Sequence, residues 1–440
     1  MLKIAILGAG MSGFGAAHCF HSAGLPTTLF EKELYHGGLT ASFEYPGGYT
    51  FDKGPHVSFT ENERIQELFA KSVNGGLTVS KGYINNYWQG HWIKHPAQCN
   101  LCGLPSDLVI KILLDFIKCE DNGISEIRHY EDWLRANFGH TFAETFPMKY
   151  GKKIHTTDAH NMTTDWLGPR MYKPNLEEVL RGALSSSTPA LHYITEFRYP
   201  LKGGFVSFLD LFVNQTDLRL GSKVIEIDPD ARELHFENGP VESYDHLVSS
   251  IPLPELVPMI SNVPSGIMQA AAKLAYTNVV VVNLGIQRPD VIGAHWTYFY
   301  DDDIFFTRLS TPYLQCPNNA PSGISSLQAE IYYSPKYRPL DRSPEDCINP
   351  VKSDLRRCGI LNRSDKIVFE NAILLPYGNV IFDHERLEAM ATVKNFLSQI
   401  GIHVCGRFGT WDYLWTDQAF LSGEKAARDV IQSIYEKKAT

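Results

Sequence analysis

Lys3-Ile-Ala-Ile-Leu-Gly8-Ala-Gly10-Met-Ser-Gly13 is the stretch that decides the fold, because an apolar run leads directly into closely spaced glycines. Residues 4–7 predict a buried parallel strand, which turns at Gly8 into a helix. Gly10 lets backbone approach a pyrophosphate, and Gly13 lets the helix pack closely on the strand. Because the N–H groups at the start of that helix favour an anion, the stretch predicts a dinucleotide-binding domain.

An acidic residue and two further glycines follow at the spacing of a cofactor site. Glu31 stands 18 residues after Gly13, at the end of a predicted strand over residues 27–30, where it is placed to accept a hydrogen bond from a ribose hydroxyl. Gly37 and Gly38 resemble the second glycine motif of FAD enzymes in the glutathione-reductase-like superfamily, which favours FAD over NAD. The residues of these motifs and strands that are predicted to bind the cofactor are Gly8, Gly10, Met11, Ser12, Gly13, Glu31, Lys32, Gly37, Gly38, Leu39 and Val224.

Composition and charge restrict the class of protein. The 440 residues are 44% hydrophobic, which is enough to bury a large core divided between two or three lobes. The net charge is −9 and the basic residues are scattered, so we expect no nucleic-acid partner. We also expect no membrane span and no signal peptide, because no apolar run is long enough and no charged leader is present. The expectation is a cytoplasmic protein.

The eight cysteines are irregularly spaced and do not form the pattern of a disulfide framework. Cys99 and Cys102 have the spacing of a zinc or redox pair, but no second pair of this kind and no histidine pair at ligand spacing accompanies them. We therefore expect two free thiols and no metal site.

The order of predicted elements indicates an α/β fold, in which an FAD-binding Rossmann-like domain carries a helical insertion and an antiparallel-sheet substrate lobe. Helical periodicity from residue 106 to about residue 186 predicts the insertion over residues 96–190. The FAD-binding domain is assigned to residues 1–90, 200–255 and 395–440, and the substrate-binding lobe to residues 256–394. The FAD-binding domain is thus expected to be discontinuous.

Most predicted strands of the substrate lobe are rich in Val, Ile, Phe and Tyr. They cover residues 277–286, 296–300, 304–309, 326–333 and 366–374. Shorter strands are predicted within residues 223–228, 233–239, 244–251 and 402–406, and helices over residues 61–71 and from 418 or 419 to 435.

Seven fragments occur in a specific order along the chain. They are Gly54-Pro-His56-Val-Ser-Phe59, Gly90-His-Trp-Ile-Lys-His95-Pro-Ala-Gln98, Tyr150-Gly-Lys-Lys, Trp166-Leu-Gly-Pro-Arg170, Phe306-Thr-Arg308, Pro376-Tyr377-Gly, and Gly406-Arg407-Phe-Gly-Thr-Trp-Asp-Tyr413 with Asp417-Gln418. Together they resemble the motifs of the UDP-galactopyranose mutase family of flavoenzymes.

The resemblance implies an isomerase that interconverts the pyranose and furanose forms of a nucleotide-linked sugar, with no net redox change, as a step of glycan biosynthesis. In that family FAD acts in its reduced form. Its N5 atom displaces the nucleoside diphosphate and forms an adduct with the sugar, so the covalent catalyst is the cofactor and not a side chain.

A departing diphosphate requires fixed cations and hydroxyl donors. Arg170 and Arg308 are the candidate catalytic cations, because a guanidinium offers paired donors to phosphate oxygens. Tyr377 and Tyr413 stand at positions similar to those of the family's diphosphate-binding tyrosines. The resemblance places His56, the third catalytic candidate, at the flavin face.

The remaining site residues also follow from the resemblance. Phe59, His95 and Gln98 are expected to contact the base or ribose of the substrate. Arg407 is expected to meet the FAD pyrophosphate, while Asp417 and Gln418 are expected near the ribityl chain or the pyrimidine edge of the flavin. A plain helix cap is an alternative for Asp417 that does not exclude this role.

Four positions depart from the family pattern. His95 and Ala97 stand where relatives have an aromatic or apolar residue and a phenylalanine, and Gly151 and Ile154 stand where relatives have a polar residue and a tryptophan. Loss of a tryptophan removes a large stacking surface. A different sugar, a different nucleotide or an altered reaction therefore stays open.

Two other functions also stay open. One is an FAD-dependent oxidoreductase of the amine oxidase or protoporphyrinogen oxidase type, and the other is a scaffold that binds FAD without catalysis. The paired arginines and tyrosines favour the mutase, because an amine or porphyrinogen gives no reason to gather them. The expected partners are a nucleotide-sugar substrate and NAD(P)H or another reductant, and a homo-oligomer is compatible with the sequence.

Overall fold

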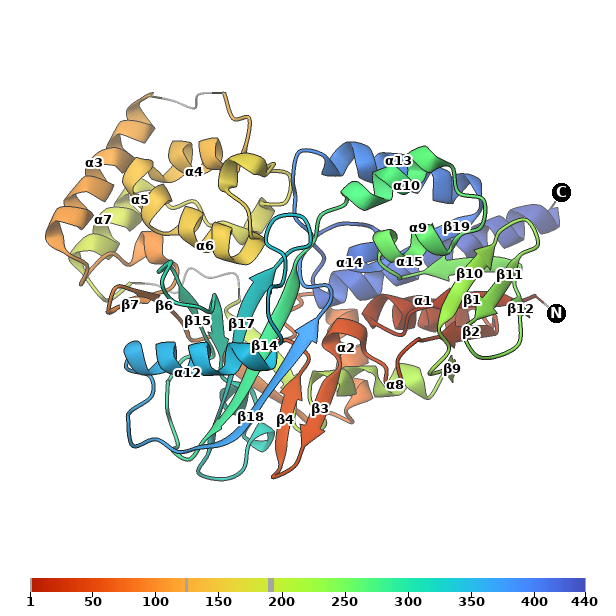
Figure 1. Cartoon of the computed structure of the whole chain (residues 1–440), viewed down its shortest axis with the longest axis horizontal. Helices are drawn as coiled ribbons and strands as arrows, with labels where there is room; N and C mark the ends of the chain where they lie inside the picture. The colour runs from red at the N-terminus through yellow and green to blue at the C-terminus, as the bar shows by residue number, and fades with distance from the viewer. Residues whose placement is uncertain (1, 123–125, 189–193, 440) are drawn as a thin grey trace.

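A five-stranded parallel sheet is built around the glycine-rich stretch. In the computed structural model, which describes residues 2–122, 126–188 and 194–439, the strand order is β19-β13-β1-β2-β9. The bounds are β1 (Ile4–Leu7), β2 (Thr27–Phe30), β9 (Asp217–Arg219), β13 (His246–Ser249) and β19 (Ile402–Val404). The sheet therefore draws its strands from the start, the middle and the end of the chain, and it lies in the lobe that holds both termini (Figure 1).

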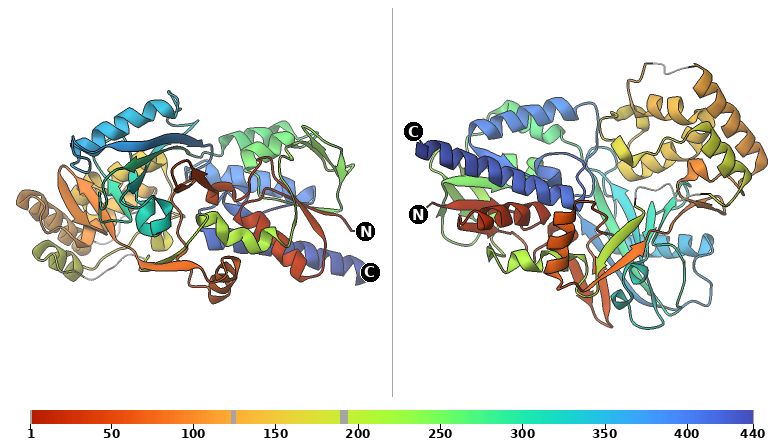
Figure 2. Two further views of the ribbon diagram at one scale, coloured as in Figure 1. Left: turned by 90° about the horizontal axis from the view of Figure 1, so that it is seen from below. Right: turned by 180° about the vertical axis from the view of Figure 1, so that it is seen from behind.

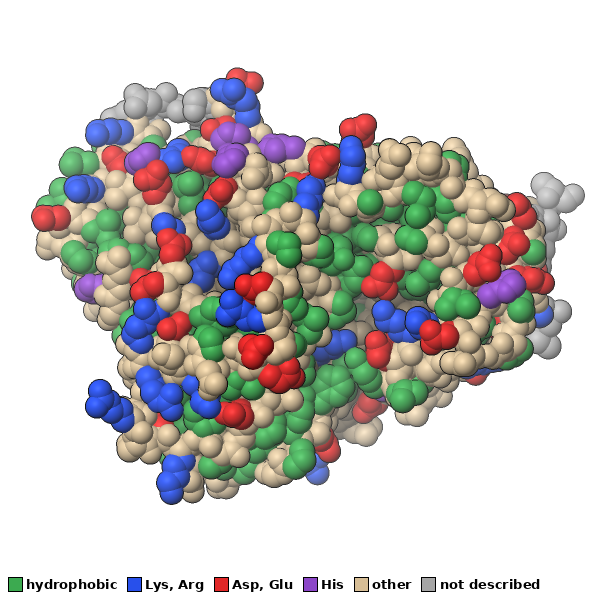
Figure 3. Space-filling view, in the orientation of Figure 1, with side chains coloured by type: hydrophobic (Ala, Val, Ile, Leu, Met, Phe, Trp, Pro, Cys, Tyr) green, Lys and Arg blue, Asp and Glu red, His purple; other side chains and the backbone are tan. Residues whose placement is uncertain are grey.

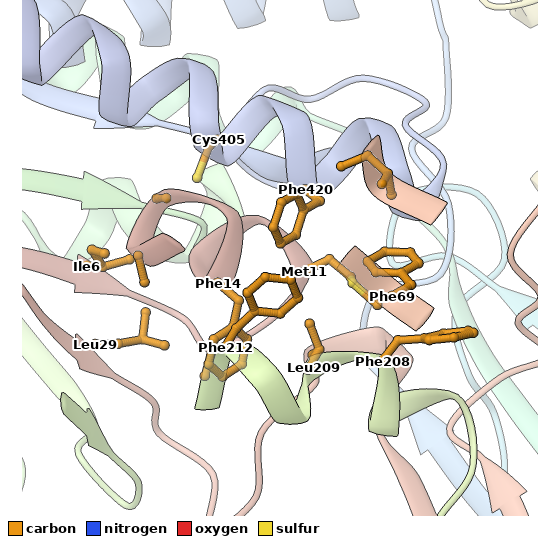
Figure 4. Packing of buried hydrophobic residues seen from close by; sticks show 14 of the residues in the cluster. Ile6, Met11, Phe14, Leu29, Phe69, Phe208, Leu209, Phe212, Cys405 and Phe420 are labelled. Carbon is orange, nitrogen blue, oxygen red and sulfur yellow. The ribbon is translucent and has the colours of Figure 1, made fainter. Parts of the chain in front are cut away.

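Two long helices cover one face of this sheet. α1 (Met11–Ser22) and α15 (Thr416–Ala439) lie side by side (Figure 2). They approach so closely that a Cβ on Gly423 would lie 1.8 Å from the carbonyl oxygen of Ser12. Phe14, Phe212 and Phe420 fill the space beneath them (Figure 4). The long C-terminal helix predicted from the sequence is confirmed, and it begins two or three residues earlier than expected.

The other face of the parallel sheet is covered by α9 (Leu253–Met259), α10 (Ser265–Lys273) and α13 (Arg386–Gln399). A separate three-stranded antiparallel sheet consists of β10 (Val224–Asp228), β11 (Glu233–Phe236) and β12 (Glu242–Ser243). Smaller helices of the chain are α2 (Glu63–Ser72), α8 (Asp210–Val213), α11 (Pro312–Gln315) and α14 (Gly406–Gly409).

A seven-stranded, mostly antiparallel sheet forms the second lobe, with the order β18-β14-β17-β16-β15-β6-β7. Its strands are β6 (Ile84–Trp88), β7 (His91–Lys94), β14 (Asn278–Ile286), β15 (Trp296–Phe299), β16 (Arg308–Ser310), β17 (Ser325–Tyr333) and β18 (Ile367–Leu375). α12 (Ile348–Arg357) packs on one face through Val351 and Leu355. Two short pairs, β3 (Ser42–Tyr45) with β4 (Tyr49–Asp52) and β5 (Leu77–Lys81) with β8 (Glu196–Pro200), complete the strands.

Two expectations about this lobe are corrected. The strand predicted over residues 304–309 is reduced to β16, because residues 304–307 form bends and an irregular segment before the strand begins at Arg308. Residues 84–94 were grouped in large part with the FAD-binding domain, but β6 pairs with β15 in the seven-stranded sheet. That pairing joins residues more than two hundred positions apart, which no local pattern indicates.

The helical insertion lies against one end of the seven-stranded sheet (Figure 1). It contains α3 (Ser106–Asn122), α4 (Tyr130–Phe138), α5 (His140–Thr145), α6 (Pro147–His155) and α7 (Leu176–Leu184). An apolar core that includes Leu134, Phe138 and Phe146 joins these helices. α7 begins with a capping box in which Asn175 and Glu178 exchange hydrogen bonds. The predicted α/β class with a helical insertion is thus confirmed.

The surface charge and the cysteines show no single dominant feature on the face and in the pair of thiols described here. Acidic and basic side chains are interspersed over both lobes on the face seen in Figure 3. None of the helices in the described part of the chain is long and apolar enough to cross a membrane. Cys99 is buried, Cys102 is exposed, and both are free thiols.

Candidate functional site

A cavity of about 300 Å³ opens where β1 and β2 end and α1 begins, and we call it the cofactor cavity. A volume of this order is typical of small-molecule sites. Of the residues predicted to bind the cofactor, those that line it are Gly8, Gly10, Met11, Ser12, Glu31, Lys32, Gly37, Gly38, Leu39, Val224 and Arg407. Residues of both glycine motifs therefore meet Arg407, which follows β19 near the C-terminus, in the wall of one cavity.

The two glycine motifs leave bare backbone in the wall of the cofactor cavity. Gly10 and Gly37 form a bridge between the motifs, and a Cβ on Gly38 would lie 3.2 Å from the Cα of Gly10. Gly10 also precedes α1, and no side chain caps the first N–H groups of that helix. A wall without side chains beside free helical N–H donors fits the pyrophosphate of a dinucleotide.

Glu31 is fixed in the cavity wall by backbone. Its Oε2 accepts from the Ala9 N–H at 2.8 Å and its Oε1 accepts from the Glu33 N–H at 3.0 Å. The side chain is almost buried, with 8% of its residue surface exposed. The carboxylate is therefore held in one orientation, with lone pairs left for a hydroxyl donor.

Three predicted cofactor residues lie outside the lining of the cofactor cavity. Gly13 packs α1 on β1 instead, because its Cβ would lie 1.9 Å from the Gly8 carbonyl oxygen. Asp417 accepts a hydrogen bond from the Thr60 hydroxyl at 2.6 Å, and Gln418 accepts from the Trp415 N–H at 3.0 Å. Successive residues of a helix point about 100° apart, so Thr416 and Ala419 face the cavity in place of these two.

A second cavity, which we call the middle cavity, shares Leu39, His56, Arg407, Trp415 and Thr416 with the cofactor cavity. His56 therefore stands at the boundary between the two. Its Nδ1 lies 2.6 Å from the Gly54 carbonyl oxygen, which can only accept, so Nδ1 carries the proton and Nε2 is left as an acceptor. Burial lowers the pKa of His56 to about 4, which keeps the ring neutral at physiological pH.

A third cavity of about 330 Å³ lies between α6 and the seven-stranded sheet. We call it the aromatic cavity, because its walls include Tyr130, Phe142, Phe146, Tyr150, Trp166, Tyr298, Tyr300 and Tyr413. It shares Tyr298, Arg308 and Tyr413 with the middle cavity. The three cavities thus adjoin one another in a row from the glycine motifs to the helical insertion.

Arg308 lies at the boundary between the middle and aromatic cavities, paired with a buried carboxylate. It stands directly opposite Glu330 in the register of β16 and β17. Its Nη2 donates to Glu330 Oε1 at 2.8 Å, its Nε donates to Oε2, and Glu330 is only 3% exposed. Burial acts to lower the pKa of Arg308, but the charge of Glu330 outweighs it and the pKa is raised. The cation is therefore permanent and its orientation is fixed.

Arg170 and Arg407 contact the ring of Tyr413. The guanidinium carbons lie 4.4 Å and 4.8 Å from its centroid. Arg170 donates to the Tyr413 carbonyl oxygen at 2.5 Å, and Arg407 donates to the Leu414 carbonyl oxygen at 2.6 Å. Burial lowers the pKa of Arg407. Among the described residues that line these two cavities, Glu330 is the only carboxylate, so three guanidiniums face one negative charge there, which favours an anion.

The predicted substrate residues divide between the cavities. His95, Gln98 and Tyr413 line the aromatic cavity, where His95 Nδ1 lies 3.1 Å from Asn86 Oδ1 and Gln98 donates to the Tyr172 carbonyl oxygen at 2.8 Å. Phe59 lines the middle cavity and contacts Trp415 edge to face, at a centroid distance of 4.9 Å.

Tyr377 is not where the sequence predicts it. It lines the cofactor cavity, and its ring stacks on Tyr276 at a centroid distance of 4.3 Å. It follows β18 directly, and it lines neither the middle cavity nor the aromatic cavity, where Arg308 and Tyr413 lie. Three of the four side chains expected around a diphosphate are therefore brought together, and Tyr377 is the exception.

Of the four residues that depart from the family pattern, three line the aromatic cavity and one does not. Gly151 and Ile154 line the aromatic cavity, whereas Ala97 is buried in the core of the helical insertion. His95 faces the cavity and contacts the ring of Tyr298.

Several residues at the site were not singled out from the sequence. Trp415 lines two cavities and stands within the fragment that ends at Gln418, two positions after Tyr413, so its place in that motif was a usable signal. Tyr298 and Tyr332 lie on strands that the sequence predicts only as Val-, Ile-, Phe- and Tyr-rich elements of the substrate lobe, and Glu330 lies on the same predicted strand as Tyr332. His155 also lines the aromatic cavity, and no motif in the sequence marks it as a site residue.

The model for the flavin containing amine oxidoreductase family matches residues 11–431. A crystal structure of reduced UDP-galactopyranose mutase superposes with a TM-score of 0.92 at 26% identity, covering 98% of this chain and 96% of that one. The resemblance deduced from the seven fragments is thereby confirmed.

Two oxidases share the fold at lower identity. A putative protoporphyrinogen oxidase from an Exiguobacterium species gives a TM-score of 0.76 at 17% identity, with 98% of each chain covered. Cyclohexylamine oxidase from Brevibacterium oxydans gives a TM-score of 0.68 at 12% identity, with 99% of each chain covered.

Proposed function

The chain belongs to the family of flavin-containing amine oxidoreductases. We propose that, within this family, it acts as a flavin-dependent nucleotide-sugar mutase. In this proposal it interconverts pyranose and furanose forms without net redox change. FAD, which the family match and the mutase structure support as the cofactor, occupies the cofactor cavity. The substrate extends from the middle cavity into the aromatic cavity.

One observation carries the proposal. Arg308, Arg170 and Tyr413 meet where the two substrate cavities adjoin, and the same middle cavity borders the cofactor cavity at His56. An amine substrate would leave these guanidiniums without a reason to face a cavity. A diphosphate that must be held, released and taken back supplies one.

Each side chain then has a role that follows from its chemistry. Reduced flavin would supply the nucleophile. Arg308 and Arg170 hold the diphosphate oxygens, and their fixed positions mean that little reorganisation is needed as charge develops on them. The phenol of Tyr413 adds a neutral donor. His56, neutral with Nε2 as an acceptor, can take a hydrogen bond at the flavin side of the sugar.

The oxidase neighbours favour a second candidate, an oxidoreductase that passes a hydride from its substrate to the flavin. The two functions differ in a measurable way, since the oxidase consumes an electron acceptor in every turnover and the mutase does not.

The test is an anaerobic assay of the holoenzyme. The protein is reduced with dithionite, or with NADH or NADPH to examine the physiological reductant, and mixed with UDP-galactose and a panel of other sugar nucleotides. We expect an isomeric sugar nucleotide to accumulate over many turnovers while the flavin absorbance stays that of the reduced form. The same protein kept oxidised is the control. Absence of isomer from every sugar nucleotide, or turnover of amines with consumption of O₂, would contradict the proposal.

A further inference from the structure

Gln315 presents an unpaired carboxamide to the middle cavity. It is the last residue of α11, it is 2% exposed, and it lines this cavity but neither the cofactor cavity nor the aromatic cavity. Its Oε1 and Nε2 both keep accessible surface, and neither forms a hydrogen bond within the described ranges of the chain. The little surface that Gln315 keeps is therefore on its carboxamide, facing the cavity. Because a buried amide without a partner is unfavourable, a ligand that pairs with it is favoured there.

The strand register places Gln315 beyond Arg308, on the side away from the aromatic cavity. Arg308 stands opposite Tyr298, and Ser310 stands opposite Trp296. All four line the middle cavity, but only Arg308 and Tyr298 also line the aromatic cavity. The chain runs from Arg308 through Ser310 into α11, so Gln315 lies past the Ser310 end. Two residues of an antiparallel strand span about 7 Å, so the middle cavity extends past Arg308 by the length of one sugar ring.

A diphosphate held at Arg308 fixes which part of the sugar reaches Gln315. The anomeric carbon is bonded to the diphosphate, so the far edge of the sugar, with the hydroxyls on C4 and C6 of a hexose, is directed to Gln315. The C4 oxygen enters the ring when the furanose forms. The C6 hydroxyl is free in both ring forms, so it is the group that can stay paired with a fixed carboxamide throughout the reaction.

The chemistry of this end of the cavity suits a sugar hydroxyl. A carboxamide offers donors and an acceptor, and a hydroxyl both donates and accepts. The indole N–H of Trp296 already donates to Tyr298 Oη at 3.1 Å, so Trp296 offers the cavity its apolar ring. A polar edge can thus be bound by Gln315 while the carbon-bonded hydrogens of the sugar pack on the indole.

We propose that Gln315 binds the C6 hydroxyl of the sugar, and that the enzyme thereby distinguishes nucleotide-linked hexoses from pentoses and 6-deoxyhexoses. This inference rests on the proposed function, and it assigns a residue that neither the motifs nor the family resemblance singles out. The residue is held in place without a ligand, because its backbone carbonyl accepts from the Thr78 hydroxyl at 3.1 Å.

The experiment compares kcat/KM of the reduced holoenzyme for UDP-galactose and two analogues under anaerobic conditions. UDP-6-deoxygalactose carries a methyl group in place of the C6 hydroxymethyl, and UDP-arabinopyranose lacks C6 altogether. Wild type should favour UDP-galactose over each analogue by about 10-fold or more, because each leaves the carboxamide unpaired. Gln315→Met keeps the side-chain length. It should lower kcat/KM for UDP-galactose by about 10-fold and change the values for the analogues by less than about 2-fold.

A control variant and a second measurement keep the test decisive. Gln432→Met changes an exposed glutamine of α15 that bonds Glu436, and its kinetics should equal those of wild type. FAD content, the thermal midpoint and the spectrum of the reduced flavin report whether Gln315→Met is folded and loaded. The comparison of substrates on wild type needs no variant and applies even if Gln315→Met does not fold.

The outcomes separate this inference from the proposed function. Wild type that converts the 6-deoxy or pentose analogue as well as UDP-galactose would overturn the inference. A folded Gln315→Met that keeps the wild-type preference, or that loses FAD, would also overturn it and would leave the mutase proposal standing. Absence of isomer from every sugar nucleotide would contradict the proposed function itself.

Discussion

Replacing Arg308 with alanine is expected to abolish most of the isomerase activity while the protein keeps its flavin. We expect kcat/KM to fall by about 30- to 1,000-fold, which corresponds to about 2 to 4 kcal/mol of lost transition-state stabilisation. The reason is that Arg308 faces both substrate cavities but does not line the cofactor cavity. Steady-state kinetics and the flavin-to-protein absorbance ratio measure the two effects.

The buried partner of Arg308 requires a matched control. Arg308→Ala leaves the Glu330 carboxylate buried at 3% exposure without its cation, and such a loss is strongly destabilising. The double variant Arg308→Met with Glu330→Gln removes both charges. It should recover much of the lost thermal stability and recover no activity. If the double variant regained activity, Arg308 would serve only to neutralise Glu330.

Gly10→Ala is expected to lose affinity for FAD, whereas Gly13→Ala is expected to lose stability. Gly10 has φ −91° and ψ −174°, which any residue adopts, and the nearest atom to its added Cβ would be the Gly38 Cα at 3.9 Å. Gly10→Ala should therefore fold. Its methyl group would project from the bare wall of the cofactor cavity, so we expect FAD affinity to fall by about 10-fold or more.

Gly13→Ala should instead destabilise the protein itself. The added Cβ would lie 1.9 Å from the Gly8 carbonyl oxygen, which is backbone and cannot turn away. α1 would have to move off β1, at a cost of about 1 to 3 kcal/mol or more. Thermal unfolding of the FAD-free proteins and titration of each with FAD distinguish the two outcomes. Equal loss of stability in both variants would mean that Gly10 also serves packing.

The glycine-rich stretch was predictable because its chemistry is local. The strand, the turn at Gly8, the helix and the position of Glu31 are all set by residues near one another in sequence, and they meet in one wall of the cofactor cavity. The long helix α15 was predictable for the same reason. Side-chain direction within that helix was not predictable, and the structure shows Asp417 bonded to Thr60 while Thr416 and Ala419 line the cofactor cavity.

The substrate side was harder because it depends on contacts between distant segments. Arg308 pairs with Glu330 through the register of two strands, and Glu330 lies in a run that is buried along its whole length. Tyr377 follows β18, and only the path of the chain after that strand reveals which cavity it enters.

The most direct test of the account is positional isotope exchange in the sugar nucleotide. The bridging oxygen between the sugar and the β-phosphorus of UDP-galactose, or of whichever sugar nucleotide the panel identifies, is labelled with ¹⁸O and incubated with reduced holoenzyme. If Arg308, Arg170 and Tyr413 hold a diphosphate that leaves and returns, the label must scramble into the nonbridging β-phosphate oxygens, as ³¹P spectra would record. Isomer formation with the label still in the bridge would contradict the central claim.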